Sequence, residues 1–203
     1  MQGTVLNRSL QTVVFMNLAN KLTISRIFLA GFFILFLFIK GPAAKFMAMA
    51  IFLAACVTDY YDGYLARKTN GVTSFGKLMD PIADKILILG AFLAFVEMEV
   101  IPAWMVMIII ARELIITGIR ILALSQKKVL SAEVGGKHKT VSQMVAVISI
   151  LIFLIIRDLG FTIRYAEYFN IGLQVLMIIV VAMTIASGIS YMIKNKDIFM
   201  GDK

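Results

Sequence analysis

The fold class is indicated by residues 168–193, which read YFNIGLQVLMIIVVAMTIASGISYMI and contain no charged side chain. A helix that crosses the hydrocarbon core of a bilayer needs about 20 mainly apolar residues. Five further runs of this kind occupy residues 22–39, 43–66, 78–97, 101–125 and 139–157. The sequence therefore predicts an all-α membrane protein with six transmembrane helices.

The composition agrees with a membrane protein. Of the 203 residues, 61% are hydrophobic and 16% are charged, whereas soluble domains are about 25% charged. The chain is too apolar to be disordered, and its single cysteine excludes a disulfide scaffold. Short connections leave no room for a soluble domain, so we expect residues 17–203 to form one membrane domain. Residues 1–16 are either an N-terminal extension or a short interfacial helix.

The positive charge predicts the orientation. If the N-terminus is cytoplasmic, fourteen of the 20 Lys and Arg residues lie in cytoplasmic segments and four lie on the opposite side. Lys and Arg are enriched in cytoplasmic loops, so both termini are expected in the cytoplasm. The net charge of +8 is then explained by topology, by an anionic ligand, or by both. No nucleic-acid partner is expected.

Four aspartates lie where a membrane helix should exclude them. Asp59 and Asp62 are near the cytoplasmic end of the second run, and Asp80 and Asp84 are near the start of the third. Carboxylates at this depth are costly and mark functional sites by default. Residues spaced i, i+3 or i, i+4 share one helix face, so each pair forms an acidic stripe.

Small residues accompany both acidic stripes. Gly63 and Ala66 share the face of the first pair, and Gly76 precedes the second pair by one helical turn. Their small side chains leave room for a bulky group beside the carboxylates. Pro81 lacks an N–H, which a helix tolerates at this position if it begins only one turn earlier.

The carboxylates need positive charge to neutralise their mutual repulsion. Oxygen ligands favour hard divalent cations such as Mg²⁺, Mn²⁺ or Ca²⁺. Two such ions match four carboxylates in charge and are a recurrent device in phosphoryl transfer. A cation transporter is the alternative, although transporters more often place their acids near the midplane between internal repeats, and no repeat is evident here.

Residues 59–84 also carry a recognisable motif, DYYDGYLARKTNGVTSFGKLMDPIAD. It resembles the signature of the CDP-alcohol phosphotransferase family, D-x-x-D-G-x-x-A-R-(x8)-G-x-x-x-D-x-x-x-D, at all eight fixed positions. The resemblance implies a metal-dependent transfer from a CDP-linked donor to a hydroxyl, with release of CMP.

The resemblance also implies roles for individual residues. Asp59, Asp62 and Asp80 would be ligands of two Mg²⁺ or Mn²⁺ ions per active site, and Asp84 would be both a ligand and the general base. Binding of CDP-diacylglycerol would involve Asn20, Thr23, Arg26, Asp62, Gly63, Ala66, Arg67 and Gly76. Arg67 has an alternative role as an interfacial anchor.

Other segments are similar to one branch of the family, the phosphatidylglycerophosphate synthases. These segments are residues 17–26, residues 111–113 with Arg120, and residues 136–140. The branch implies transfer of the phosphatidyl group of CDP-diacylglycerol to sn-glycerol-3-phosphate by in-line attack, giving phosphatidylglycerophosphate and CMP. It further implies a homodimer in the bacterial inner (cytoplasmic) membrane, with the active site facing the cytoplasm. Cardiolipin and phosphatidylserine synthases remain alternatives within the family.

The residues of these segments suit an anionic acceptor. Arg112 follows an apolar run and lies deeper than an interfacial anchor, and Glu113 is placed to pair with an arginine. Two glycines, two ammonium groups, a hydroxyl and a helix N-terminus near residues 135–140 suit a phosphate. Glycerol-3-phosphate is therefore expected to bind Arg112, Glu113, Arg120, Lys137, Lys139 and Thr140. The alternative for the two lysines is a purely topological role.

Overall fold

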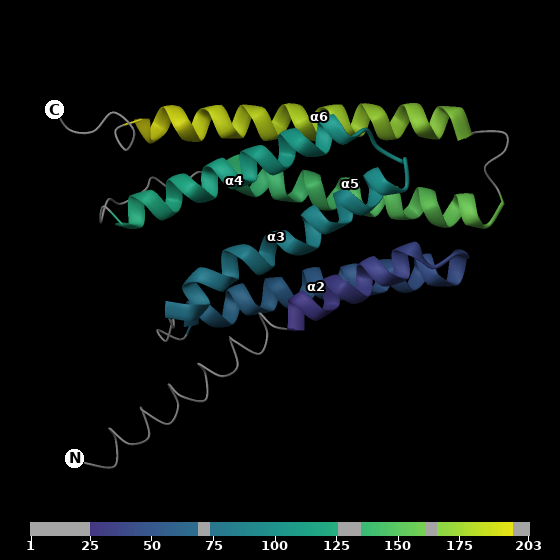
Figure 1. Ribbon diagram of the computed structural model, residues 1–203, viewed down its shortest axis with the longest axis horizontal. Helices are drawn as coiled ribbons and strands as arrows, with labels where there is room; N and C mark the ends of the chain where they lie inside the picture. The colour runs from purple at the N-terminus through teal and green to yellow at the C-terminus, as the bar shows by residue number, and fades with distance from the viewer. Residues whose placement is uncertain (1–24, 69–73, 126–134, 161–165, 197–203) are drawn as a thin grey trace, which may run out of the picture. The chain divides into compact units, whose positions relative to one another are not determined.

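The computed structural model describes the backbone of residues 25–68, 74–125, 135–160 and 166–196. Within these ranges it has six helices and no strand, which confirms the all-helical prediction. The helices are Ser25–Phe38, α2 Pro42–Lys68, α3 Ser74–Glu97, α4 Ala103–Ser125, α5 Gly135–Asp158 and α6 Ala166–Lys194 (Figure 1). The helical side chains of residues 59–68, 74–84, 124–125, 135–138 and 166–167 lie outside the described part. The chain divides into two compact units, Met1–Gly90 and Ala91–Lys203.

The start of α3 differs from the prediction. The helix begins at Ser74, so Pro81 lies in the helix interior rather than near its first turn. Proline has no N–H to donate to the carbonyl four residues earlier, which here is the carbonyl of Lys77. The condition under which Pro81 is easily tolerated, a helix that begins only one turn earlier, is therefore not met.

Close packing of three helices defines the first unit. The ring of Phe33 on the helix Ser25–Phe38 packs against Phe52 of α2, with ring centroids 5.6 Å apart, and both side chains are fully buried. A Cβ atom on Gly90 of α3 would lie 3.0 Å from Cδ1 of Ile34. Gly90 therefore allows α3 to approach the first helix closely.

Lys45 is a buried cation of the first unit. It is 3% exposed, and its Nζ donates to the carbonyls of Leu37 at 2.5 Å and Ile39 at 2.7 Å. The last carbonyls of a helix have no intrahelical donor, so the ammonium group of Lys45 caps the helix Ser25–Phe38. The ammonium group of Lys45 therefore has a structural role in the first unit.

The second unit is built on α6, which contacts both α4 and α5 (Figure 1). The rings of Phe153 on α5 and Phe169 on α6 stack with centroids 5.9 Å apart. Toward the other end of α6, Tyr191 packs in a buried cluster with Ile116, Ile119 and Ala123 of α4. These contacts hold α4, α5 and α6 together as one packed body.

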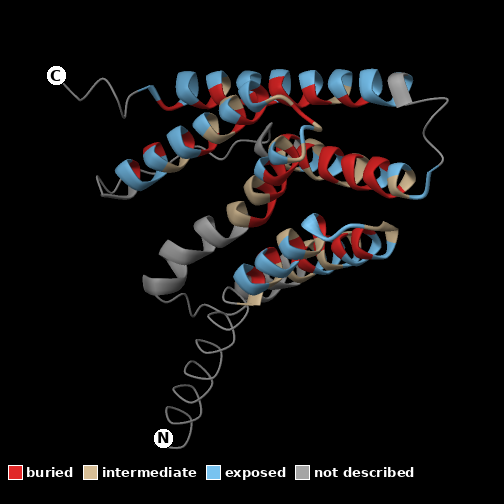
Figure 2. Cartoon of the chain, turned by 45° about the vertical axis from the view of Figure 1, so that its right-hand side comes forward, coloured by how far each residue is buried: buried red, intermediate tan, exposed pale blue. Residues whose placement is uncertain are grey.

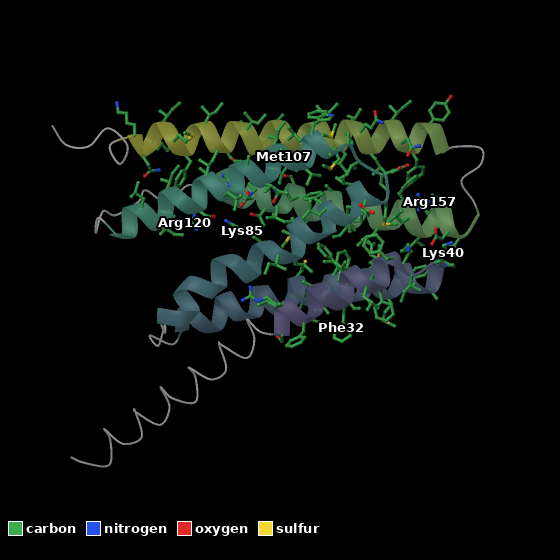
Figure 3. The ribbon with its side chains drawn as sticks, viewed as in Figure 1. Phe32, Lys40, Lys85, Met107, Arg120 and Arg157 are labelled. Atoms are coloured by element: carbon green, nitrogen blue, oxygen red, sulfur yellow. The ribbon has the colours of Figure 1, made fainter. Side chains whose placement is uncertain are left out.

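Many large apolar side chains of both units are exposed, and Figure 2 colours the exposed faces of the helices pale blue. Phe32 on the first helix is 55% exposed, and Met107 on α4 is 68% exposed (Figure 3). Continuous apolar surface of this kind is rare on proteins that face water. It is the surface expected of helices that face lipid.

Among the described residues, two helices are long and apolar enough to cross a membrane, Lys139–Asp158 and Tyr168–Lys194. Shorter apolar helices occupy Ser25–Phe38 and Pro42–Thr58. Helix α4 is also apolar but carries three charged residues, Arg112, Glu113 and Arg120. Six spans and cytoplasmic termini stay predictions, and the three charged residues of α4 are candidates for function.

Candidate functional site

The backbone places the four aspartates on two helices. Asp59 and Asp62 lie in the second half of α2, and Asp80 and Asp84 lie in the first half of α3. Helical backbone at both pairs supports the expected i, i+3 and i, i+4 stripes. The aspartate side chains lie outside the described part, as do those of Gly63, Ala66, Arg67 and Gly76.

The chemistry of these aspartates suits a divalent metal. Oxygen-only donors match Mg²⁺ and Mn²⁺, so the residue types fit the ions expected from the motif. Among the side chains that the structure describes, no group of three or more His, Cys, Asp and Glu residues lies together. The aspartates are not among those side chains, and their role as ligands stays a prediction.

Of the predicted nucleotide-binding residues near the N-terminus, only Arg26 is described. Its side chain is buried in the first turn of the helix Ser25–Phe38. Asn20 and Thr23 lie outside the described residues. A buried guanidinium in an apolar unit is unusual, which agrees with a functional role without assigning one.

A buried charge cluster lies in the second unit. Oε1 of Glu113 accepts a hydrogen bond from Nη1 of Arg112 at 3.2 Å and another from Nζ of Lys139. The side chains of Arg112, Glu113 and Lys139 are 12%, 7% and 6% exposed. The sequence predicted that Glu113 would pair with an arginine, and the structure adds that it joins Arg112 on α4 to Lys139 on α5.

The cluster has the charge expected of an anion receptor. It contains two cations and one carboxylate, so the three groups together carry one positive charge. Burying charge is costly unless it is paired, and a bound anion would add a partner to Arg112 and Lys139. Guanidinium and ammonium groups are the side chains that proteins most often use to bind phosphate.

Helix α6 contributes to the cluster through residues that the sequence analysis did not single out. Nη2 of Arg112 donates to Oγ of Ser187 at 3.0 Å, and Ser187 is 9% exposed. The next residue, Gly188, packs against the stem of Arg112. The sequence does contain a pattern that predicts this contact face of α6. Thr184, Ser187 and Tyr191 are spaced i, i+3, i+7 in an apolar helix, and polar residues in membrane helices usually face other helices.

Further polar atoms are buried in this unit. Nε2 of Gln143, Oγ1 of Thr184 and the hydroxyl of Tyr191 have no hydrogen-bond partner among the described residues. Gln143 follows Lys139 by one turn of α5, and Thr184 precedes Ser187 by one turn of α6. Buried polar groups without partners are rare, so they mark this part of the helix packing as a place for a polar ligand or water.

The other three predicted acceptor residues are Arg120, Lys137 and Thr140. Arg120 lies on α4 with an exposed side chain (Figure 3). Thr140 is half-buried and follows Lys139 directly, while the side chain of Lys137 lies outside the described part. The cluster centres on Arg112, Glu113 and Lys139, and the roles of the other three stay predictions.

Comparison with known proteins identifies relatives over most of the chain. A family model described as CDP-alcohol phosphatidyltransferase matches residues 16–189. The chain is 37% identical over 191 residues to the CDP-diacylglycerol–glycerol-3-phosphate 3-phosphatidyltransferase of Bacillus subtilis strain 168, covering 88% of this chain and 95% of the relative. Proteins of the same name are 35% identical in Rickettsia bellii, covering 86% of this chain and 93% of the relative, and 35% identical in Haemophilus influenzae, covering 84% and 89%.

Proposed function

Because the chain belongs to the CDP-alcohol phosphatidyltransferase family, we propose that it transfers the phosphatidyl group of CDP-diacylglycerol to sn-glycerol-3-phosphate. The products are phosphatidylglycerophosphate and CMP. Relatives that cover most of the chain bear the name of this activity. The eight fixed positions of the motif in residues 59–84 support the same reaction class.

One observation carries the choice of acceptor, the buried cluster of Arg112, Glu113 and Lys139. Its net positive charge favours a phosphorylated acceptor over an uncharged alcohol or a zwitterion such as serine. Glu113 holds both cations, so the site needs little reorganisation when the phosphate of glycerol-3-phosphate binds. Arg120, Lys137 and Thr140 are further candidate contacts.

The residues of α2 and α3 are assigned to the donor. Asp59, Asp62, Asp80 and Asp84 would hold two Mg²⁺ or Mn²⁺ ions, which supply charge neutralisation for the diphosphate when bound. The small residues of the motif leave room for the cytidine nucleotide, and Arg67 pairs with a phosphate or a motif carboxylate. Asn20, Thr23 and Arg26 are further candidates for nucleotide contacts.

The chemical step is a substitution at phosphorus. Asp84 accepts the proton of the 1-hydroxyl of glycerol-3-phosphate, and the resulting oxygen attacks the β-phosphorus of CDP-diacylglycerol. A new phosphorus–oxygen bond forms, the bond to the bridging oxygen breaks, and CMP leaves with that oxygen. Most of the rate enhancement comes from holding the two substrates in line and balancing their charge.

The reaction is assigned to the cytoplasmic face of a bilayer, where a lipid-linked donor and a water-soluble acceptor meet. Two long apolar helices and the exposed apolar surface of both units support a bilayer location. The distribution of Lys and Arg supports cytoplasmic termini. The family resemblance supports a homodimer in a bacterial inner membrane.

An acceptor screen tests the function. Release of CMP from CDP-diacylglycerol is measured in detergent with glycerol-3-phosphate, serine, inositol or phosphatidylglycerol, each with and without a chelator. We expect turnover with glycerol-3-phosphate alone, loss of turnover with the chelator, and its recovery on addition of Mg²⁺ or Mn²⁺. Turnover with serine or phosphatidylglycerol but not glycerol-3-phosphate would instead assign a phosphatidylserine or cardiolipin synthase.

A further inference from the structure

Arg112 is anchored from two sides. Its Nη1 donates to Glu113 on the same helix at 3.2 Å, and its Nη2 donates to Oγ of Ser187 on α6 at 3.0 Å. Two contacts at different nitrogens fix the plane of a guanidinium, whereas one contact leaves it free to rotate. Glu113 lies on α4 next to Arg112, whereas the contact with Ser187 comes from another helix, α6.

The hydroxyl of Ser187 is itself oriented. Its Oγ donates to the backbone carbonyl of Thr184 at 3.1 Å. A hydroxyl has one hydrogen to donate and two lone pairs that accept, so Ser187 presents its lone pairs to Arg112. Arg112 donates to Ser187, and Ser187 in turn donates to the backbone of α6. In such a chain each hydrogen bond polarises and strengthens the next.

The residue after Ser187 makes the space that this contact needs. A Cβ atom on Gly188 would lie 3.1 Å from Cγ and 3.7 Å from Nε of Arg112. Contacts as short as 3.1 Å would force the stem of Arg112 to shift by a few tenths of an ångström. Small residues let membrane helices approach closely, and here the absence of a side chain lets Arg112 lie against α6.

We propose that Ser187 and Gly188 of α6 are positioning residues that hold the guanidinium of Arg112 in the orientation that binds the acceptor phosphate. The inference rests on the proposed function and deepens it, because it brings α6 into acceptor recognition. A fixed guanidinium loses less conformational freedom on binding an anion. The contacts with Ser187 and Gly188 therefore raise the affinity for glycerol-3-phosphate and do not change the affinity for CDP-diacylglycerol.

Kinetics of α6 variants in detergent test this role. Initial rates of CMP release are measured against glycerol-3-phosphate and CDP-diacylglycerol separately for the wild type, Ser187→Ala, Ser187→Thr and Gly188→Ala. We expect Ser187→Ala and Gly188→Ala each to raise the KM for glycerol-3-phosphate about tenfold, equivalent to about 1.4 kcal/mol, with kcat and the KM for CDP-diacylglycerol unchanged. Ser187→Thr keeps the hydroxyl and should restore the wild-type KM.

The same helix offers matched controls. Gly172→Ala introduces a Cβ atom with nothing within 4 Å, and Ser190→Ala removes a hydroxyl from a half-buried serine. Both controls should leave the KM for glycerol-3-phosphate unchanged. They separate an effect on Arg112 from a general effect of altering α6. If Gly188→Ala does not fold, the two Ser187 variants still test the positioning role.

The outcomes separate this inference from the proposed function. A wild-type enzyme that does not turn over glycerol-3-phosphate overturns both. A wild type that uses glycerol-3-phosphate, with an unchanged KM in Ser187→Ala and Gly188→Ala, overturns only the positioning role. Equal increases in KM for both substrates, or no recovery in Ser187→Thr, would show a structural role for α6 instead.

Discussion

The aspartates of α2 and α3 and the charge cluster of α4, α5 and α6 differ in how the chain assembles them. The aspartates lie in one stretch, residues 59–84, with helical spacing inside each pair. The cluster instead joins residues separated by 26 positions, Glu113 and Lys139, and by 75 positions, Arg112 and Ser187. A local group can be found by its spacing, whereas a long-range group is found only once the helices have packed.

The two regions also differ in how they deal with buried charge. The aspartates are predicted to form a set of like charges, which protons or cations would have to neutralise. The cluster balances part of its charge internally, because Glu113 contacts both Arg112 and Lys139. The first region should therefore respond to metal removal, and the second should respond to the concentration of the anionic acceptor.

The largest effect is expected in the aspartate region. Asp84→Asn removes the proposed base without changing the size of the side chain, and should lower kcat for CMP release by about 10²- to 10⁴-fold. Asp158→Asn, at the end of α5 and paired with Arg157 at 3.9 Å, is the matched control and should retain turnover. Near-normal turnover in Asp84→Asn would remove Asp84 as the base and weaken the contrast between the two regions.

A smaller and more selective effect is expected in the cluster. Arg112→Ala should raise the KM for glycerol-3-phosphate on the order of 100-fold, since hydrogen bonds to charged groups contribute about 1.5–3 kcal/mol each. The KM for CDP-diacylglycerol should change much less. Glu113 and Lys139 keep their contact in this variant, so the unit should remain folded.

Arg120→Ala provides a comparison for Arg112→Ala on the same helix. Arg120 is exposed and no described contact joins it to the cluster, so its replacement should change the KM for glycerol-3-phosphate within about fivefold. An effect as large as that of Arg112→Ala would show that Arg120 contacts the acceptor directly. An equal effect of Arg112→Ala on both substrates would argue that Arg112 has a structural role.

The smallest effect is expected for the buried cation of the first unit, Lys45. Lys45→Met keeps the apolar stem but removes the hydrogen bonds to Leu37 and Ile39, and should lower the thermal unfolding midpoint in detergent by about 3–6 °C. Lys40→Met, at an exposed position (Figure 3), is the control and should leave the midpoint unchanged. A raised KM for glycerol-3-phosphate in Lys45→Met would contradict its assignment as a helix cap.

Much of the architecture could be predicted from hydropathy alone. The six apolar runs correspond to the six described helices, because an apolar run of this length satisfies its backbone hydrogen bonds only as a helix when it lies in lipid. The limits of α3 could not be predicted, since Pro81 is normally read as a helix boundary and the helix instead begins at Ser74. The dual role of Glu113 and the capping role of Lys45 could not be predicted for a different reason. Glu113 binds a cation from another helix, α5, and Lys45 binds carbonyls that the turn after the preceding helix brings near.

The sequence by itself therefore determined the helical class, the family motif of residues 59–84 and the acidic stripes, because all three depend on spacing within one segment. Only the tertiary structure decided that Arg112 lies against Ser187 and Gly188 of α6 and that Glu113 joins it to Lys139. The physical reason is that a buried charge takes its partners from the helices that pack around it. Which side chains of different helices come into contact depends on which helix faces pack together.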